Sequence, residues 1–224
     1  MQVALIISLV NDEKKGVPAC LDECQRQVES VELSGEYSFS IFINEGGRVG
    51  YQKIWEDISG RGFDFYLWMN SDLQLKEDAL ASFFENSMFL RHKAVITGTV
   101  LDLSGNLIFG GRSRHGRILE PDAVIPVPCH LYDMALTLVP EYAVKCLENP
   151  LDVFRTNFLD YGCGAKVAKA GVARVIAPGI MAKTARKPEL PAWKDSQKSV
   201  RERAVSLLKA CDRWIIHVLH SIFR

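Results

Sequence analysis

Apolar runs alternate with amphipathic, helix-patterned segments over most of the chain. The runs at residues 3–10 and 63–69 have the length and composition of strands that are buried on both faces of a sheet. Weaker strand patterns occur at residues 37–43, 94–101, 135–139 and 173–177. Apolar residues recur at helical spacing between these runs. The alternation predicts an α/β fold with a mostly parallel sheet flanked by helices.

The strand pattern at residues 63–69 stops abruptly at Asn70-Ser71-Asp72, and we expect a helix from about residue 76. Ligands of open α/β sheets bind in the crevice beyond the carboxyl ends of the strands. A carboxylate in this position is well placed to hold a metal ion and the phosphates attached to it. The same three residues also suit a turn followed by a helix cap, and spacing alone leaves both interpretations open.

The C-terminal part of the chain differs in composition from the rest. Residues 182–198 are polar, basic and interrupted by prolines, which predicts a linker between a domain at 1–181 and an amphipathic helix at 199–224. The apolar residues of that helix are too many for a solvated helix and too few for a membrane span. We expect the helix either to contact a membrane surface or to dock onto the core or a second subunit.

Overall composition excludes several functions. The formal net charge is +0, so nothing suggests a nucleic-acid partner. The six cysteines include no C-x-x-C pair and no zinc-site spacing. The chain opens directly into a strand pattern without a leader, so we expect a cytoplasmic protein with reduced thiols.

The segment at residues 110–127 is rich in glycine and proline and carries three arginines, Arg112, Arg114 and Arg117. We expect an irregular surface loop there. Its arginines either touch a ligand or form a solvated face, and the second interpretation is favoured. His115 and His130 are not assigned as metal ligands, because a single histidine in a loop is more often a surface residue.

Three segments carry a resemblance to a known family. They are the apolar strand ending at Asn11, the run at residues 65–73 with the helix pattern after it, and residues 159–171 followed by the strand pattern at 175–179. In this order and at these separations, they resemble the family 2 glycosyltransferases with the GT-A fold. The resemblance covers roughly residues 2–180.

The resemblance implies an inverting glycosyltransferase that moves a sugar from a nucleotide-sugar donor to a hydroxyl acceptor. The acceptor would be a saccharide or a lipid-linked saccharide, in bacterial cell-surface polysaccharide synthesis. Asp72 would hold Mg²⁺ or Mn²⁺, and Asp160 would be the general base, although a position at a helix start also suits an N-cap. The implied substrate-binding residues are Asn11, Asn44, Glu45, Gly46, Gly47, Asn70 and Tyr161. The C-terminal helix would add peripheral contact with the inner face of the membrane.

Two alternatives stay open. Asn44-Glu45-Gly46-Gly47 stands where relatives usually carry an Asp-rich stretch, and the central motif has one carboxylate where many relatives have two. A catalytically inactive GT-A-like protein that binds a nucleotide sugar or a protein partner would fit these departures. A nucleotidyltransferase shares the alternating plan but lacks support, because no glycine-rich basic loop follows the first strand.

Overall fold

The computed structural model describes residues 1–9, 20–44, 47–146, 167–186, 199–202 and 204–205. The chain divides into two units, Met1–Arg186 and Lys187–Arg224. The helices of the first unit are α1 (Leu21–Glu32), α2 (Gly47–Ile58), α3 (Ala79–Phe89) and α4 (Glu141–Lys145). Its strands are β1 (Gln2–Ser8), β2 (Ser38–Asn44), β3 (Phe65–Asn70), β4 (Leu73–Leu75), β5 (Ala94–Asp102), β6 (Leu107–Phe109), β7 (Gly111–Arg112), β8 (Val127–Pro128), β9 (Leu131–Tyr132), β10 (Leu136–Pro140) and β11 (Ala173–Thr184).

Nine of these strands form one sheet, whose main path is β2-β1-β3-β10-β5-β11-β4. Strand β1 is parallel to β2 and β3, and β11 is parallel to β5. Strand β10 is antiparallel to both of its neighbours, β3 and β5. Strands β7 and β9 form a separate two-stranded sheet. The predicted α/β class is confirmed, and the sheet is mixed.

The direction of β10 follows from the connection that precedes it. Residues 103–135, all of which the structure describes, contain turns and short strands but no helix. A parallel connection needs a crossover, usually a helix, that carries the chain back to the opposite edge. Without one, β10 begins at the edge where β5 ends and must run in the opposite direction.

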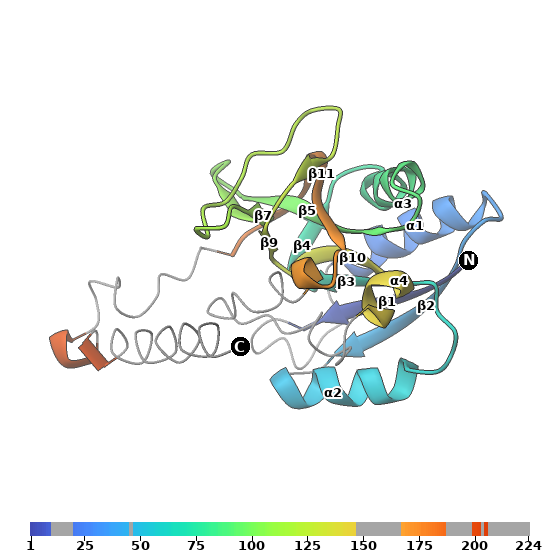
Figure 1. The fold of residues 1–224 in the computed structure, drawn as a ribbon, viewed down its shortest axis with the longest axis horizontal. Helices are drawn as coiled ribbons and strands as arrows, with labels where there is room; N and C mark the ends of the chain where they lie inside the picture. The colour runs from blue at the N-terminus through green and yellow to red at the C-terminus, as the bar shows by residue number, and fades with distance from the viewer. Residues whose placement is uncertain (10–19, 45–46, 147–166, 187–198, 203, 206–224) are drawn as a thin grey trace. The chain divides into compact units, whose positions relative to one another are not determined.

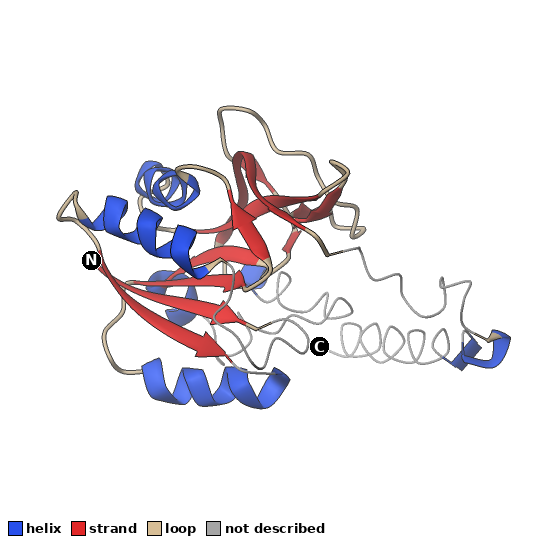
Figure 2. Ribbon diagram, turned by 180° about the vertical axis from the view of Figure 1, so that it is seen from behind, coloured by secondary structure: helices blue, strands red, loops and turns tan. Residues whose placement is uncertain are grey.

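Helices cover both faces of the sheet (Figures 1 and 2). Helices α1 and α3 pack on one face, where Val28, Phe83 and Phe84 join a core cluster with Leu5 and Leu67. Helices α2 and α4 contribute to a second cluster on the other face, which includes Trp68. Trp68 is 2% exposed and fills the core. Burial of β1 and β3 on both faces explains their unbroken apolar runs.

Several element bounds differ from the sequence prediction. A short strand, β4, lies between Asp72 and α3, and α3 begins at Ala79 rather than near residue 76. Strand β11 continues to Thr184, so the first three residues assigned to a linker belong to the sheet. The expected irregular loop at 110–127 contains β7 and the start of β8.

The described part of the second unit is the start of the predicted C-terminal helix. Residues 200–202 and 204–205 are helical, and Ser199 precedes them. The hydroxyl of Ser199 accepts from the backbone N–H of Glu202 at 3.3 Å, and the Glu202 carboxylate accepts from the backbone N–H of Ser199 at 3.0 Å. This reciprocal capping box fixes where the helix begins. No described helix is long and apolar enough to cross a membrane.

Candidate functional site

The carboxyl ends of three adjacent strands bring polar residues together. Ser8 of β1 lies in register with Asn44 of β2 on one side and with Asn70 of β3 on the other. The side-chain amide of Asn44 donates to the Ser8 hydroxyl at 3.0 Å, and Asn44 is 1% exposed. Asn70 is half-buried, and its backbone N–H donates to the carbonyl of Ala135 at 2.8 Å. Asn44 therefore ties β1 to β2 at this edge, and its contact with a nucleotide stays a prediction.

Asp72 lies just beyond Asn70, between β3 and β4. Its Oδ2 accepts a hydrogen bond from the hydroxyl of Thr184 at 3.0 Å. Its Oδ1 is buried and has no hydrogen-bond partner among the described residues. A buried carboxylate oxygen without a partner is costly, so such an atom points to a cation or a donor that completes the site.

Thr184 reaches Asp72 because of an irregularity in β11. The register of β11 against β5 shifts between Ile176 and Ile180 and again before Ala182, and Gly179 adopts a φ of +69°. Beyond this bulge, β11 pairs with β4 so that Thr184 lies opposite Leu73, next to Asp72. Thr184 is fully buried, and its hydroxyl also accepts from the backbone N–H of Arg186 at 3.0 Å. Bulges of this kind often re-aim a side chain beside a functional site.

Sequence reasoning missed Thr184. The strand was expected to end at Ala177, because Pro178 and Gly179 interrupt its apolar pattern. The signal that was available is the return of apolar residues at Ile180, Met181 and Ala182 directly after that interruption.

Most of the other predicted site residues lie outside the described residues. These are Asn11, Glu45, Gly46, Asp160 and Tyr161. Gly47 is described as the first residue of α2, so a helix begins at the second glycine of the pair, directly after the carboxyl end of β2. Val167, near the end of the predicted acceptor segment, and Val172, directly after it, pack in the cluster that contains Trp68. The end of that segment therefore lies on the α2 face of the sheet.

A largely buried ion pair lies close to this edge. The guanidinium of Arg112 contacts the Asp133 carboxylate at 2.8 Å, and the two side chains are only 12% and 17% exposed. The backbone N–H of Gly110 also donates to Asp133 at 3.2 Å. Burial raises the pKa of Asp133, and the positive charge of Arg112 opposes that rise. The expectation of a solvated arginine face is therefore wrong for Arg112, whereas Arg114 and Arg117 are exposed.

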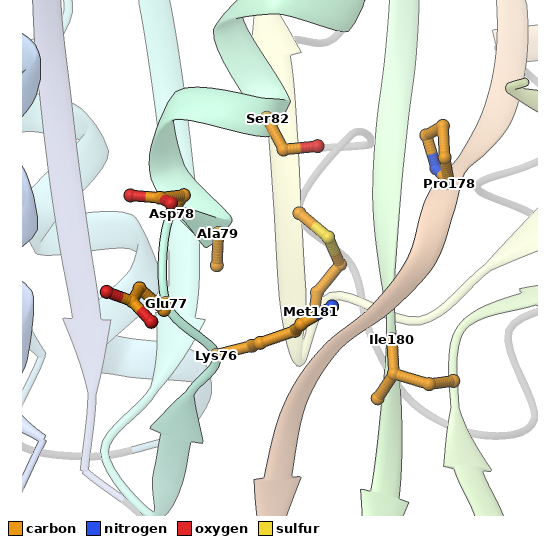
Figure 3. Close-up of a pocket in the computed structure, with 8 residues that line it drawn as sticks. All are labelled: Lys76, Glu77, Asp78, Ala79, Ser82, Pro178, Ile180 and Met181. Carbon is orange, nitrogen blue, oxygen red and sulfur yellow. The ribbon is translucent and has the colours of Figure 1, made fainter. Parts of the chain in front are cut away.

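A hollow of about 340 Å³ lies between the start of α3 and β11 (Figure 3). It is lined by Lys76, Glu77, Asp78, Ala79, Ser82, Pro178, Ile180 and Met181. None of these residues is a predicted site residue, and the hollow does not include Asp72. Gln27 holds its rim, since the side-chain amide of Gln27 donates to the Lys76 carbonyl at 2.8 Å and accepts from the Leu80 N–H at 3.0 Å. We assign no ligand to this hollow.

The carboxylate at this edge of the sheet suits a hard cation that keeps several of its water ligands. Within the described ranges, no group of three or more His, Cys, Asp or Glu side chains is arranged to hold a metal ion. Asp72 would therefore be a single protein carboxylate. Mg²⁺ is commonly held by one or two carboxylates together with substrate phosphates and waters, so Asp72 fits that arrangement.

Comparison with known proteins gives likeness in fold only. No family model matches the sequence, and no curated protein matches it. The crystal structure of A197 from STIV is similar with a TM-score of 0.50 at 10% identity, over 85% of this chain and 88% of that chain. TarS from S. aureus, residues 1–349, gives a TM-score of 0.47 at 8% identity, over 82% of this chain and 60% of that one. GalNAc-T7, solved with UDP, GalNAc and Mn²⁺, gives a TM-score of 0.43 at 11% identity, over 81% of this chain and 42% of that one. The chain thus spans less than two thirds of the TarS and GalNAc-T7 chains.

Proposed function

We propose that this chain is a GT-A-like glycosyltransferase that acts at the carboxyl edge of β1, β2 and β3. The donor is a nucleotide sugar, and the acceptor is a hydroxyl group of a saccharide or a lipid-linked saccharide. The observation that carries the proposal is the carboxylate of Asp72. One of its oxygens is fixed by Thr184, and the other is buried and without a partner in the described structure.

In the proposed reaction, one set of residues binds the donor diphosphate and another activates the acceptor hydroxyl. A divalent cation, when bound, offsets the charge that develops on the leaving diphosphate. Asp72 would hold that cation, and Thr184 would keep the carboxylate in one orientation. Asn70 and the start of α2 at Gly47 would line the donor side, where backbone N–H groups favour phosphate oxygens.

On the acceptor side, Asp160 would accept the proton of the attacking hydroxyl. Attack opposite the leaving group would invert the anomeric centre. This role comes from the family resemblance of residues 159–171, which lie outside the described residues apart from their last five. The basic, apolar C-terminal helix would hold the chain at an anionic membrane surface, and polysaccharide assembly would be the setting.

A thermal-shift panel of nucleotide sugars, each with and without Mn²⁺, tests the proposal. A ligand that binds the folded state raises stability by RT ln(1 + [L]/Kd), about 2.7 kcal/mol at a hundredfold excess over Kd. We expect at least one nucleotide sugar to raise the melting temperature in the presence of Mn²⁺. Release of nucleoside diphosphate in the presence of acceptor then separates an enzyme from an inactive nucleotide-sugar binder. The proposal fails if no nucleotide sugar shifts the melting temperature.

A further inference from the structure

The segment from Arg112 to Ile118 forms a closed hairpin with an unusual share of positive charge. The backbone N–H of Ser113 donates to the Arg117 carbonyl at 2.8 Å, and the N–H of Gly116 donates to the Ser113 carbonyl at 3.0 Å. Arg112 and Ile118 pair as an isolated bridge. The segment carries three arginines and one histidine and no carboxylate, although the whole chain has a formal net charge of +0.

The tip of this hairpin exposes its cations. Arg114, His115 and Arg117 are exposed, and neither arginine forms an ion pair with any described residue. His130 is also exposed, and its backbone N–H donates to the Arg112 carbonyl at 2.9 Å, which adds a second imidazole beside the hairpin. Glu120 is the nearest carboxylate along the chain and lies beyond the bridge at Ile118. Clustered like charges of this kind create a positive local potential that attracts anions.

The tip is held in one conformation by Arg112. Its guanidinium contacts the buried Asp133 carboxylate and also donates to the Gly116 carbonyl at 3.1 Å, so one side chain joins the base of the hairpin to its tip. A buried ion pair is a costly way to hold a surface loop, which argues for a loop whose position matters. A preordered loop loses less conformational entropy when it binds a ligand.

The hairpin is also fixed relative to the candidate site. The Asp133 carbonyl accepts from the hydroxyls of Thr97 at 3.1 Å and Thr137 at 2.8 Å, which anchor it to β5 and β10. Two residues later, the Ala135 carbonyl accepts from the N–H of Asn70, the last residue of β3. Strands β7 and β9 lie on the side of the sheet toward which β1 and β2 point (Figure 1). The base of the hairpin is thus connected, through Asp133 and Ala135, to the end of β3, two residues before Asp72.

We propose that Arg114 and Arg117, on the tip of the Arg112–Ile118 hairpin, form a binding surface for phosphate groups of the acceptor. Guanidinium groups bind phosphate through paired, charge-assisted hydrogen bonds, and two of them on one rigid turn suit a substrate with repeated or adjacent phosphates. The assignment to the acceptor rests on the proposed function, whereas the anion site itself does not. A membrane is the less suitable partner, because no exposed large apolar side chain lies within the hairpin to enter a bilayer.

Inorganic tripolyphosphate is the probe, and the full chain is used without nucleotide or metal. Arginine-selective dicarbonyl labelling, mapped by peptide mass spectrometry, reports on each arginine separately. Tripolyphosphate should slow labelling of Arg114 and Arg117 at least threefold and leave Arg91, an exposed arginine between α3 and β5, unchanged. Equal protection at Arg91 would show non-specific attraction and overturn the proposal.

Calorimetric titration with tripolyphosphate gives the affinity. R114A/R117A should bind at least fivefold more weakly than the parent, while K53A/K93A, which removes the same charge from exposed lysines elsewhere, should bind like the parent. The double arginine variant should still bind phosphatidylglycerol vesicles as the parent does. Unchanged tripolyphosphate affinity in R114A/R117A, or a selective loss of vesicle binding, would refute the acceptor surface. Binding of the nucleotide sugar that shifts the parent's melting temperature, measured with Mn²⁺ on the same variant, should be unchanged. Failure of every nucleotide sugar to bind the parent would count against the proposed function alone.

Discussion

The hydroxyl of Thr184 donates a 3.0 Å hydrogen bond to Oδ2 of Asp72 across 112 positions of sequence. The donor is fully buried at the end of β11, and the acceptor follows the central strand β3. The bond leaves Oδ1 of Asp72 buried and without a partner in the described part of the chain. This pairing is what gives the carboxylate one orientation toward the carboxyl edge of the sheet.

Removing the Thr184 hydroxyl should loosen that carboxylate. T184V keeps the shape of the side chain but leaves Oδ2 of Asp72 and the Arg186 N–H without their partner. We expect Mn²⁺-dependent binding of the donor's nucleoside diphosphate to weaken about fivefold, and the free energy of unfolding to fall by about 1–3 kcal/mol. T184S restores the hydroxyl and should restore binding. A purely structural role would lower the melting temperature of T184V without changing its Mn²⁺ dependence, which titration calorimetry would show.

Breaking the buried ion pair should destabilise the first unit far more than breaking an exposed one. R112M leaves the Asp133 carboxylate buried without its cation, at a cost of about 3 kcal/mol or more. K145M removes the exposed ammonium group of Lys145, whose Nζ lies 2.8 Å from Oε2 of Glu141 one turn away on α4. This change should lower the free energy of unfolding by less than about 1 kcal/mol. Urea denaturation of the two variants and the parent measures both differences. Similar losses in R112M and K145M would show that Arg112 is not buried against Asp133.

Stability at acid pH should depend on Glu23. Hydrogen bonds from Arg26, and then from Gln27, lower the pKa of Glu23 from 4.5 to about 2. A lowered folded-state pKa means that the unfolded state binds more protons, so this stabilisation is present above pH 4.5 and is lost as the pH falls toward 2. E23Q should therefore be less stable than the parent at pH 7, and the difference should shrink below pH 4.5.

Glu29 supplies the control for that experiment. It is exposed on the same helix, and its carboxylate makes no hydrogen bond with a described residue. Chemical denaturation of the parent, E23Q and E29Q across pH 7 to 3 separates the local effect of Glu23 from a general effect of helix charge. A difference between E23Q and the parent that stays constant with pH would contradict the assignment.

Asp160 should act on the acceptor rather than on the donor. D160N is nearly isosteric, and an asparagine can still cap a helix. We expect nearly normal donor binding with transfer slowed by about 10²-fold or more, because the variant can no longer accept a proton. Steady-state transfer and thermal melts of the same two proteins distinguish the roles. A capping role alone would change the melting temperature slightly and leave the rate of transfer at the parental value.

The residue pattern predicted local elements well where burial alone decides them. The runs that became β1 and β3 are apolar because both faces of each strand are covered, and Asp72 was proposed as a metal ligand because it lies just beyond such a run. The direction of β10 could not be predicted in this way, since an apolar strand looks the same in either direction. It depends on the missing helix between β5 and β10.

The contact between Asp72 and Thr184 could not be predicted from the sequence pattern either. Thr184 meets Asp72 because β11 bulges at Pro178 and Gly179 and then pairs with the short strand β4. That contact is set by three strands that are distant in sequence. The prediction for Arg112 was wrong for a related reason. Its partner, Asp133, lies 21 residues later, near the end of the segment that connects β5 to β10.

The proposed metal site at Asp72 is tested by titration calorimetry of the parent and D72N, with and without Mn²⁺, using the nucleoside diphosphate of the sugar donor that gives the largest thermal shift. Asparagine has nearly the same shape and keeps an oxygen for the Thr184 hydroxyl, so D72N removes the negative charge and should still fold. We expect Mn²⁺ to tighten binding of this nucleoside diphosphate to the parent by tenfold or more, and D72N to lose this enhancement while keeping the weaker metal-independent binding. An equal Mn²⁺ enhancement in D72N and the parent would contradict this prediction and reduce Asp72 to a turn residue.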